Sequence, residues 1–200
     1  ACLIVQQPNF FGYVEDLQRL SDIAHSQGAL LIVSVDLASL GMFRPPGDYD
    51  ADIVVAEAQT LGVSPSYGGP YVGVFACKGG REFLRQIPGR IVGQTVDTEG
   101  RTGYVLTLQT REQHIRRERA TSNICTSVGL IALMSAIYMA AQGKQGLRHL
   151  AELCYHKAHH LASLVQRIPG YSLPIEGTFF REFVVQCPLP PSEINEKLLD

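Results

Sequence analysis

Residues 51–77 read ADIVVAEAQTLGVSPSYGGPYVGVFAC. Two apolar segments in this stretch, Ala51–Ala56 and Tyr71–Ala76, have the length and β-branched content of buried strands. The loop between them is rich in residues that bend the chain: Gly62, Pro65, Gly68, Gly69 and Pro70. Glycine accepts positive φ and leaves its N–H uncovered, so such a loop holds either a phosphate or a closely packed backbone. We predict a strand–loop–strand unit and leave both roles of the loop open.

An acidic residue ends the apolar segment that precedes this unit. The letters LLIVSVD place Asp36 at the carboxyl end of a predicted strand, Ala29–Val35. Upstream, a strand at Cys2–Gln6 and an amphipathic helix at Tyr13–Gln27 complete a strand–helix–strand pattern. This order predicts an α/β fold whose parallel sheet is covered on both faces. Ligands bind at the carboxyl ends of the strands in such sheets, so Asp36 and the 57–70 loop mark the expected site.

Composition excludes several classes of function. The 200 residues carry a formal net charge of −2, which favours neither nucleic acid nor an anionic membrane as a partner. No run reaches the ~18 apolar residues of a membrane span. Five cysteines without a C-x-x-C pair favour free thiols in a reducing compartment. His156 and His160 lack a carboxylate to complete a ligand set, so no metal site is predicted. Neither a P-loop nor a G-x-S-x-G elbow is present.

The rest of the chain predicts a hairpin, two helices, a strand and a last helix. The hairpin includes a strand at Tyr104–Leu108, and the final helix begins near Pro190. Ile124–Ala141 is apolar around its circumference, which predicts a buried helix, and Leu147–Ile168 is a second helix beyond Gly143. The alternation in Phe179–Cys187 is typical of a strand. We therefore expect a change of domain near Gly143.

A dense basic segment precedes the long apolar helix. Within Thr110–Asn123 stand Arg111, His114, Arg116, Arg117 and Arg119, followed by Thr121, Ser122 and Asn123. Arginine binds carboxylate or phosphate through two parallel hydrogen bonds, and a helix N-terminus near Ser122 would favour the same anions. The segment is therefore a candidate subunit interface or anion site. The alternative is a solvated face with Glu112 and Glu118 as local partners.

Four segments of the chain carry a family resemblance. They are QQPNFFGYVEDL (6–17), EAQTLGVSPSYGGPYVGVFA (57–76), IPGRIVGQTVDTEGR (87–101) and LTLQTREQHIRRERATSNICT (106–126). In these motifs, and in uninterrupted order over essentially its whole length, the chain resembles the P-protein family of the glycine cleavage system. The match is to the N-terminal half of the fused form or to subunit 1 (α) of the split form. The resemblance implies a fold type I, aspartate aminotransferase-like architecture. Residues 1–142 would be the later part of a large domain and residues 143–200 the start of a small α+β domain.

The same resemblance explains why no lysine follows the strand at Ala51–Ala56. In this fold a strand-end acid pairs with the pyridine nitrogen of pyridoxal 5′-phosphate (PLP), and a lysine after the next strand forms the Schiff base. Asp36 matches the acid, either as a working contact or as a relic. The lysine would fall at Gln59–Gly62, where there is none; the chain's lysines are Lys78, Lys144, Lys157 and Lys197. In this family two homologous halves pair and the second supplies the lysine, so no catalytic residue is expected here.

The implied activity is that of an oxidoreductase subunit, inactive without its partner. The family decarboxylates glycine with PLP and passes the aminomethyl group to the lipoyl arm of the H-protein. The implied partner is a homologous, lysine-bearing subunit 2 in a cytoplasmic α₂β₂ assembly that holds the PLP covalently. Two alternatives stay open at this point: a non-catalytic scaffold with the fold of a PLP enzyme, and an independent PLP lyase or transferase.

Overall fold

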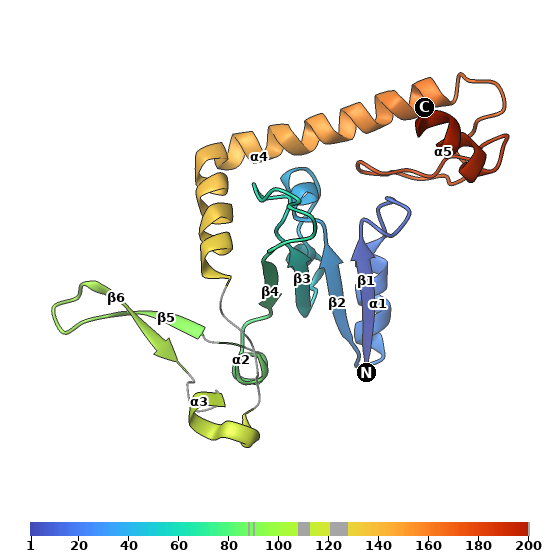
Figure 1. Ribbon diagram of the computed structural model, residues 1–200. Helices are drawn as coiled ribbons and strands as arrows, with labels where there is room; N and C mark the ends of the chain where they lie inside the picture. The colour runs from blue at the N-terminus through green and yellow to red at the C-terminus, as the bar shows by residue number, and fades with distance from the viewer. Residues whose placement is uncertain (88, 90, 108–112, 121–127, 200) are drawn as a thin grey trace.

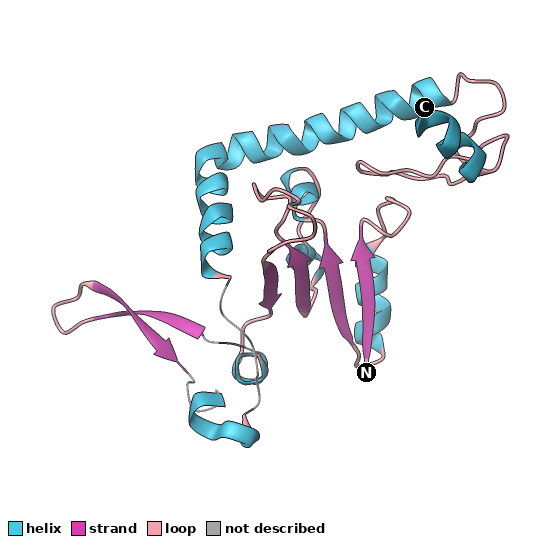
Figure 2. Ribbon diagram, viewed as in Figure 1, coloured by secondary structure: helices cyan, strands magenta, loops and turns pink. Residues whose placement is uncertain are grey.

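The computed structural model describes residues 1–87, 89, 91–107, 113–120 and 128–199. Its centre is a four-stranded sheet in the order β1-β2-β3-β4 (Figures 1 and 2). The strands are β1 (Cys2–Gln7), β2 (Leu30–Val35), β3 (Ile53–Glu57) and β4 (Gly73–Cys77). The four apolar segments predicted as strands are thus confirmed, with ends that shift by one or two residues.

The prediction of a wholly parallel sheet is wrong at its last strand. β1, β2 and β3 run parallel, whereas β4 pairs with β3 in the antiparallel direction. The connection from Glu57 to Gly73 contains no helix that could return the chain to the other end of the sheet, and a parallel neighbour needs such a crossover. The carboxyl ends of the three parallel strands nevertheless share one edge.

One face of the sheet is covered and the other is open. α1 (Leu17–Ser26) packs on it through a core of Leu17, Ala24, Leu31, Val33, Val35 and Ala51. The helix begins later than predicted because the side chain of Asp16 caps it by accepting from the N–H of Arg19. On the opposite face, Ile4 is 67% exposed and Phe75 is 45% exposed. The expectation of a sheet covered on both faces is therefore not met within this chain.

The two helices predicted on either side of Gly143 are confirmed; they meet at a sharp kink and carry the single label α4. α4 (Gly129–Val165) turns sharply at Gly143, whose φ of 61° and ψ of 180° are not helical (Figure 1). Before the bend, Leu130 and Ile137 are 70% and 59% exposed, so the prediction that this arm is buried is wrong for this chain. After the bend, the helix packs on the 3₁₀ helix η1 (Leu37–Gly41).

The C-terminal region lies over the carboxyl edge of the sheet. A second core joins Tyr13 to Ala158, Ala162 and Phe179. The segment predicted as a strand, Phe179–Cys187, forms isolated bridges at two points and no regular strand. It crosses the loop after β1 instead of joining a sheet edge, and that crossing leaves its alternating residues without a ladder. α5 (Pro191–Leu199) then confirms the predicted last helix.

The elements between residues 81 and 119 extend from the β4 side of the sheet, away from β1 (Figure 1). The 3₁₀ helix η2 (Pro46–Tyr49) precedes β3, and α2 (Arg81–Gln86) follows β4. The predicted hairpin is confirmed as β5 (Ile91–Val96) and β6 (Thr102–Thr107) in antiparallel register. The short α3 (Gln113–Arg116) and η4 (Arg117–Arg119) come next. Within the described ranges, no helix combines the length and apolar character needed to cross a bilayer.

Candidate functional site: a cleft at the carboxyl edge of the sheet

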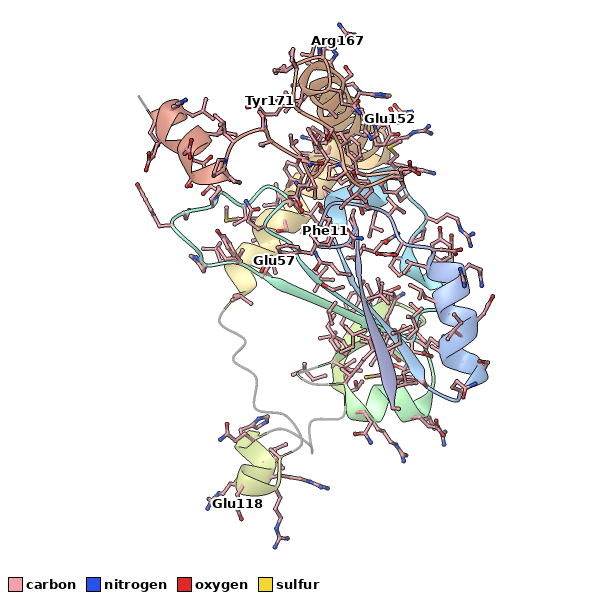
Figure 3. The ribbon with its side chains drawn as sticks, turned by 90° about the vertical axis from the view of Figure 1, so that its right-hand side faces the viewer. Phe11, Glu57, Glu118, Glu152, Arg167 and Tyr171 are labelled. Carbon is pink, nitrogen blue, oxygen red and sulfur yellow. The ribbon has the colours of Figure 1, made fainter. Side chains whose placement is uncertain are left out.

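A cleft of about 340 Å³ lies where the parallel strands end. Its walls come from four parts of the chain: the end of β1 with the loop after it, the end of β2, the end of β3, and the C-terminal segment. The lining residues used below are Gly12, Asp36, Glu57, Gln59, Thr60 and Arg181. Figure 3 shows Glu57 and Phe11 on the side of the molecule where these parts meet. The predicted position of the site, at the carboxyl ends of the strands, agrees with this cleft.

Asp36 is held in place by contacts to both of its carboxylate oxygens. Oδ1 accepts a hydrogen bond from the N–H of Ala38 at 3.0 Å, which makes Asp36 the N-cap of η1. Oδ2 lies 2.8 Å from Nη2 of Arg181, which the C-terminal segment brings across the cleft. The side chain of Asp36 is 19% exposed and that of Arg181 is 36% exposed, so water reaches this ion pair mainly from the side of the arginine. The acid predicted from the sequence does line the site, and a cation from the same chain already pairs with it.

Gln59 and Thr60 occupy the place where a lysine was sought after the third strand. The side-chain amide of Gln59 donates to the carbonyl of Val63 at 2.6 Å and stabilises the turn. The Oγ1 atom of Thr60 is buried and has no hydrogen-bond partner among the described residues. An amide and a hydroxyl cannot form a Schiff base with an aldehyde, because neither is a nucleophilic amine.

The lysines of the chain lie elsewhere. Lys78 is fixed at the opposite end of the sheet, where its Nζ is 2.9 Å from both Asp50 and Asp52. Lys144 lines a separate groove of about 1120 Å³ between η1 and α4, next to the cleft but not part of its wall. No lysine among the described residues therefore lines the cleft that contains Asp36.

The charges of the cleft oppose a bound phosphate ester. Asp36, Glu57 and Glu182 face it with three carboxylates, against the single guanidinium of Arg181. The Oε1 atom of Glu57 accepts a hydrogen bond from the backbone N–H of Gln59 at 2.9 Å. This wall of the cleft therefore carries a carboxylate, and the N–H of Gln59 is not free to bind a phosphate. With no lysine, a paired Asp36 and an excess of negative charge, the residues present do not fit a covalently held PLP.

The loop after β3 is packed closely against a helix. An added Cβ at Gly62 would lie 2.6 Å from the ring of Tyr138 on α4, and Gly62 has a φ of +84°. Of the two roles predicted for this loop, close packing describes Gly62. Nothing in the geometry of the described residues singles out a phosphate cradle in the loop.

The structure does not bring the basic segment to the cleft. His114, Arg116 and Arg117 are described and exposed, on α3 and η4. Figure 3 shows Glu118, from the same segment, at the lower end of the view, well below Phe11 and Glu57 near its middle. Arg111, Thr121, Ser122 and Asn123 lie outside the described residues, so the structure does not place them. The candidate interface is thus a separate region of the surface.

Arg181 is the site residue that sequence reasoning missed. It lies in an alternating segment that was read as a strand, far from Asp36 along the chain. Local periodicity carries no information about such a pairing. The one available signal was an isolated arginine between two aromatic residues and an acid in FFRE, which is weak on its own.

Two solved structures share this fold at low sequence identity. Sphingosine-1-phosphate lyase of Burkholderia pseudomallei K96243 matches with a TM-score of 0.56 at 17% identity, over 90% of this chain and 38% of the lyase. Mouse CSAD in its apo form matches with a TM-score of 0.58 at 16% identity, over 89% of this chain and 35% of that one. The α/β sheet thus belongs to a partial domain with the fold known as PLP-dependent transferase fold type I; at this identity the likeness shows the fold alone.

Within this class the family is specific. The glycine cleavage system P-protein model matches residues 1–198, and the chain belongs to that family. The probable glycine dehydrogenase (decarboxylating) subunit 1 of Thermomicrobium roseum is 54% identical over 200 residues, which are 100% of this chain and 44% of that protein. The protein of the same description from Desulforamulus reducens is 53% identical over 199 residues, again 100% of this chain and 44% of the relative.

A solved structure agrees with the family assignment. The crystal structure of glycine decarboxylase (P-protein) of the glycine cleavage system, in inhibitor-bound form, matches with a TM-score of 0.91 at 45% identity. The match covers 100% of this chain and 45% of that one. The chain therefore spans less than half the length of these relatives.

Proposed function

We propose that the protein containing this chain is the lysine-free subunit 1 (α) of a glycine dehydrogenase (decarboxylating). It would support PLP-dependent decarboxylation of glycine and transfer of the aminomethyl group to the lipoyl arm of H-protein. The observation that carries the proposal is the cleft itself: it has the fold of a PLP enzyme and the strand-end acid Asp36, but Gln59 and Thr60 where a lysine would stand. PLP would be held covalently by a homologous, lysine-bearing subunit 2 in an α₂β₂ assembly.

Trapping of the cofactor tests this division of labour. The full-length protein is expressed alone and with its lysine-bearing partner, loaded with PLP and reduced with borohydride. We expect the label on a lysine of the partner, and glycine–bicarbonate exchange in the complex but not in the isolated subunit. A label on Lys144 or any other lysine of this chain would contradict the proposal and favour an independent PLP enzyme.

We propose the basic segment as part of the subunit interface, or as a surface that shapes the partner's site. Arg116 and Arg117 are exposed on short helices that lie apart from the main sheet, and neither forms an ion pair with an acidic residue in the described part of the chain. His114 and the neighbouring Arg111, Thr121, Ser122 and Asn123 belong to the same proposal. Exposed guanidinium groups at this density suit a partner surface that carries carboxylates or a phosphate.

Substitution of two arginines separates an interface from a solvated face. In the co-expressed complex, Arg116→Ala with Arg117→Ala should weaken assembly or lower the exchange rate at least tenfold, and Arg19→Ala, an exposed arginine on α1, is the matched control. Assembly is measured by sedimentation and turnover by exchange. Intact assembly with unchanged turnover would show that the segment contributes neither to the interface nor to the partner's site. Loss of assembly without a change in the turnover of the remaining complex would favour a scaffold role.

The division into domains remains a proposal. We place the boundary at Gly143, with residues 1–142 in the large domain and residues 143–200 at the start of the small one. The bend of α4 at Gly143 supports it, because a glycine with positive φ is a natural point for a change of direction. We also propose the cytoplasm as the compartment; the described cysteines Cys2, Cys77, Cys154 and Cys187 are free thiols, which suits a reducing environment.

A further inference from the structure

The carboxylate of Asp36 needs a cation, and the structure supplies one from within the chain. Its side chain is 19% exposed, and a positive group stabilises a carboxylate that has lost part of its contact with water. In the PLP-dependent fold that group would be a pyridinium. Here Nη2 of Arg181 lies 2.8 Å from Oδ2, and the N–H of Ala38 occupies Oδ1 at 3.0 Å. Both oxygens of Asp36 are therefore engaged before any ligand enters.

Arg181 is brought to Asp36 by contacts that do not depend on the ion pair. The N–H of Phe180 donates to the carbonyl of Gly12 at 3.0 Å, and the N–H of Val14 donates to the carbonyl of Thr178 at 2.8 Å. The side chain of Phe180 is 1% exposed and meets the ring of Phe43 edge-on, at a centroid distance of 5.7 Å. These contacts position the segment 178–182 independently of Arg181, so the guanidinium is presented to Asp36 in a fixed place.

The close packing of segment 178–182 on the loop after β1 requires a glycine at position 12. An added Cβ at Gly12 would lie 2.0 Å from the carbonyl oxygen of Glu182, and Gly12 has a φ of +88°. No side chain fits at that distance, so the loop after β1 accepts the C-terminal segment only because residue 12 is glycine. The pairing of Arg181 with Asp36 is thus built into the main-chain packing of the cleft.

We propose that Arg181 is the permanent counter-ion of Asp36, in the role that the pyridinium of PLP would otherwise have, and that it excludes PLP from the cleft of this chain. The three carboxylates at the cleft also repel a phosphate ester. Arg181 is a specificity-determining residue in this view, and Asp36 is a structural anchor with no cofactor role. The inference goes beyond the proposed function, which places PLP on the partner, by naming the group that keeps it out of this subunit.

The test is a double-substitution cycle in the full-length subunit co-assembled with its lysine-bearing partner. Asp36→Asn keeps an oxygen for the N–H of Ala38 and removes the charge, and Arg181→Met removes the guanidinium while keeping much of its length. We expect Asp36→Asn to leave the PLP content and the exchange rate within about twofold of the unsubstituted complex. Each single change should lower the folded-to-unfolded ratio roughly tenfold in urea, with the double variant no worse than the worse single variant. Arg181→Lys should recover part of the loss, because it restores the charge without the planar fork.

Two outcomes overturn the proposal. A PLP content that falls by half on Asp36→Asn would mean that Asp36 contacts a cofactor, and additive losses in the double variant would mean that Arg181 and Asp36 are not coupled. The isolated full-length subunit is also titrated with PLP and followed by absorbance. Saturable, non-covalent binding that Asp36→Asn abolishes would show that PLP enters this cleft. That result would overturn the exclusion of PLP but not the proposed function. A covalent borohydride label on this chain would instead overturn the proposed function. The two failures are therefore distinguishable.

Discussion

The two ends of the central sheet each contain an aspartate that is paired with a cation, but they differ in what surrounds the pair. At the amino end, Asp52 is 7% exposed and takes partners from several elements: Lys78 Nζ at 2.9 Å, His25 Nε2 at 2.8 Å and the N–H of Leu31 at 2.8 Å. At the carboxyl end, Asp36 is 19% exposed and has one cationic partner, Arg181. The first aspartate is buried among its partners, although Lys78 is itself 32% exposed, whereas the second lines a cleft.

Asp52 thus has a structural role at the amino ends of the strands, whereas Asp36 lies at the cleft that forms the candidate site. The partners of Asp52 connect the end of α1, the starts of β2 and β3 and the end of β4, so the cluster ties the amino ends of the strands together. Asp36 ties one strand end to the C-terminal segment and leaves space beside it. Lys78, the lysine nearest in sequence to Gln59–Gly62, therefore belongs to the structural end and lies away from the cleft.

Removal of Asp52 should give the largest loss of stability. Asp52→Ala leaves Lys78 and His25 without their buried acceptor and orphans the N–H of Leu31. Loss of one partner of a buried ion pair typically costs about 3–5 kcal/mol, and we expect an effect of that order in urea unfolding of the full-length protein. Asp50→Asn is the control, because Asp50 pairs with the same Lys78 but is 68% exposed, and asparagine also tolerates the φ of 62° at this position; it should cost under about 1 kcal/mol. Equal losses for the two variants would show that burial does not set the energy of this cluster.

A methyl group at Gly12 should give the next largest effect. Gly12→Ala places a Cβ 2.0 Å from the carbonyl oxygen of Glu182 and forces a non-glycine residue to a φ of +88°. We expect a loss of about 2–3 kcal/mol and release of the C-terminal segment, seen as faster proteolysis after Phe180 or Arg181. Gly28→Ala separates the two causes: Gly28 also has positive φ, +63°, but an added Cβ there meets nothing within 4 Å. It should cost about 1 kcal/mol, from backbone strain alone. If both variants lose the same stability, the close approach of Glu182 contributes nothing.

The Asp52 cluster should also control the response of stability to pH. Burial alone would raise the pKa of Asp52, but hydrogen bonds from Lys78, His25 and Leu31 outweigh it and hold the pKa below 3.8. Burial would lower the pKa of Lys78, but its bonds to Asp52 and Asp50 raise it above 10.5. The contribution of Asp52 is thus full above about pH 4 and lost as the pH falls further, and that of Lys78 is full below about pH 10 and lost as the pH rises.

The measurement is the urea midpoint between about pH 2 and 6, with and without Asp52→Asn. We expect the unsubstituted protein to lose stability more steeply on the acid side than the variant, whose residue 52 does not titrate. The two curves should converge at the lowest pH. Parallel curves would mean that Asp52 does not supply the acid dependence.

How far the sequence predicted this molecule depends on the range of the interactions involved. β1 and β2 were found from local apolar patterns, because a strand buried on a core face records its burial in its own residues. The position of Asp36 followed from the same pattern. The direction of β4 was missed, since strand direction depends on the route of the connection and not on the strand itself. The bend at Gly143 was marked by the glycine, but the exposure of Leu130 and Ile137 was not, because apolar composition does not tell which chain covers a helix.

The pairing at the cleft was beyond local reasoning for the same reason. Asp36 and Arg181 meet through the fold of the C-terminal segment over Gly12, and neither residue type nor spacing records that meeting. The absence of a lysine from Gln59–Gly62 was visible in the sequence, since a covalent site depends on one residue type at one position. The pairing of Asp36 with Arg181 beside that position could be found only from the structure.

The smallest effect should come from the shortest ion pair. The Nε atom of Arg148 lies 2.7 Å from Oε1 of Glu152, one turn apart on α4, and Arg148 is 72% exposed. The hydrogen bond from Arg148 lowers the pKa of Glu152. Water screens both groups, and holding two long side chains together opposes the gain. Arg148→Ala should therefore leave the urea midpoint of the full-length protein unchanged within error. A loss comparable to that of Asp52→Ala would contradict the comparison drawn here, because distance rather than burial would then rank the ion pairs of this sheet and its helices.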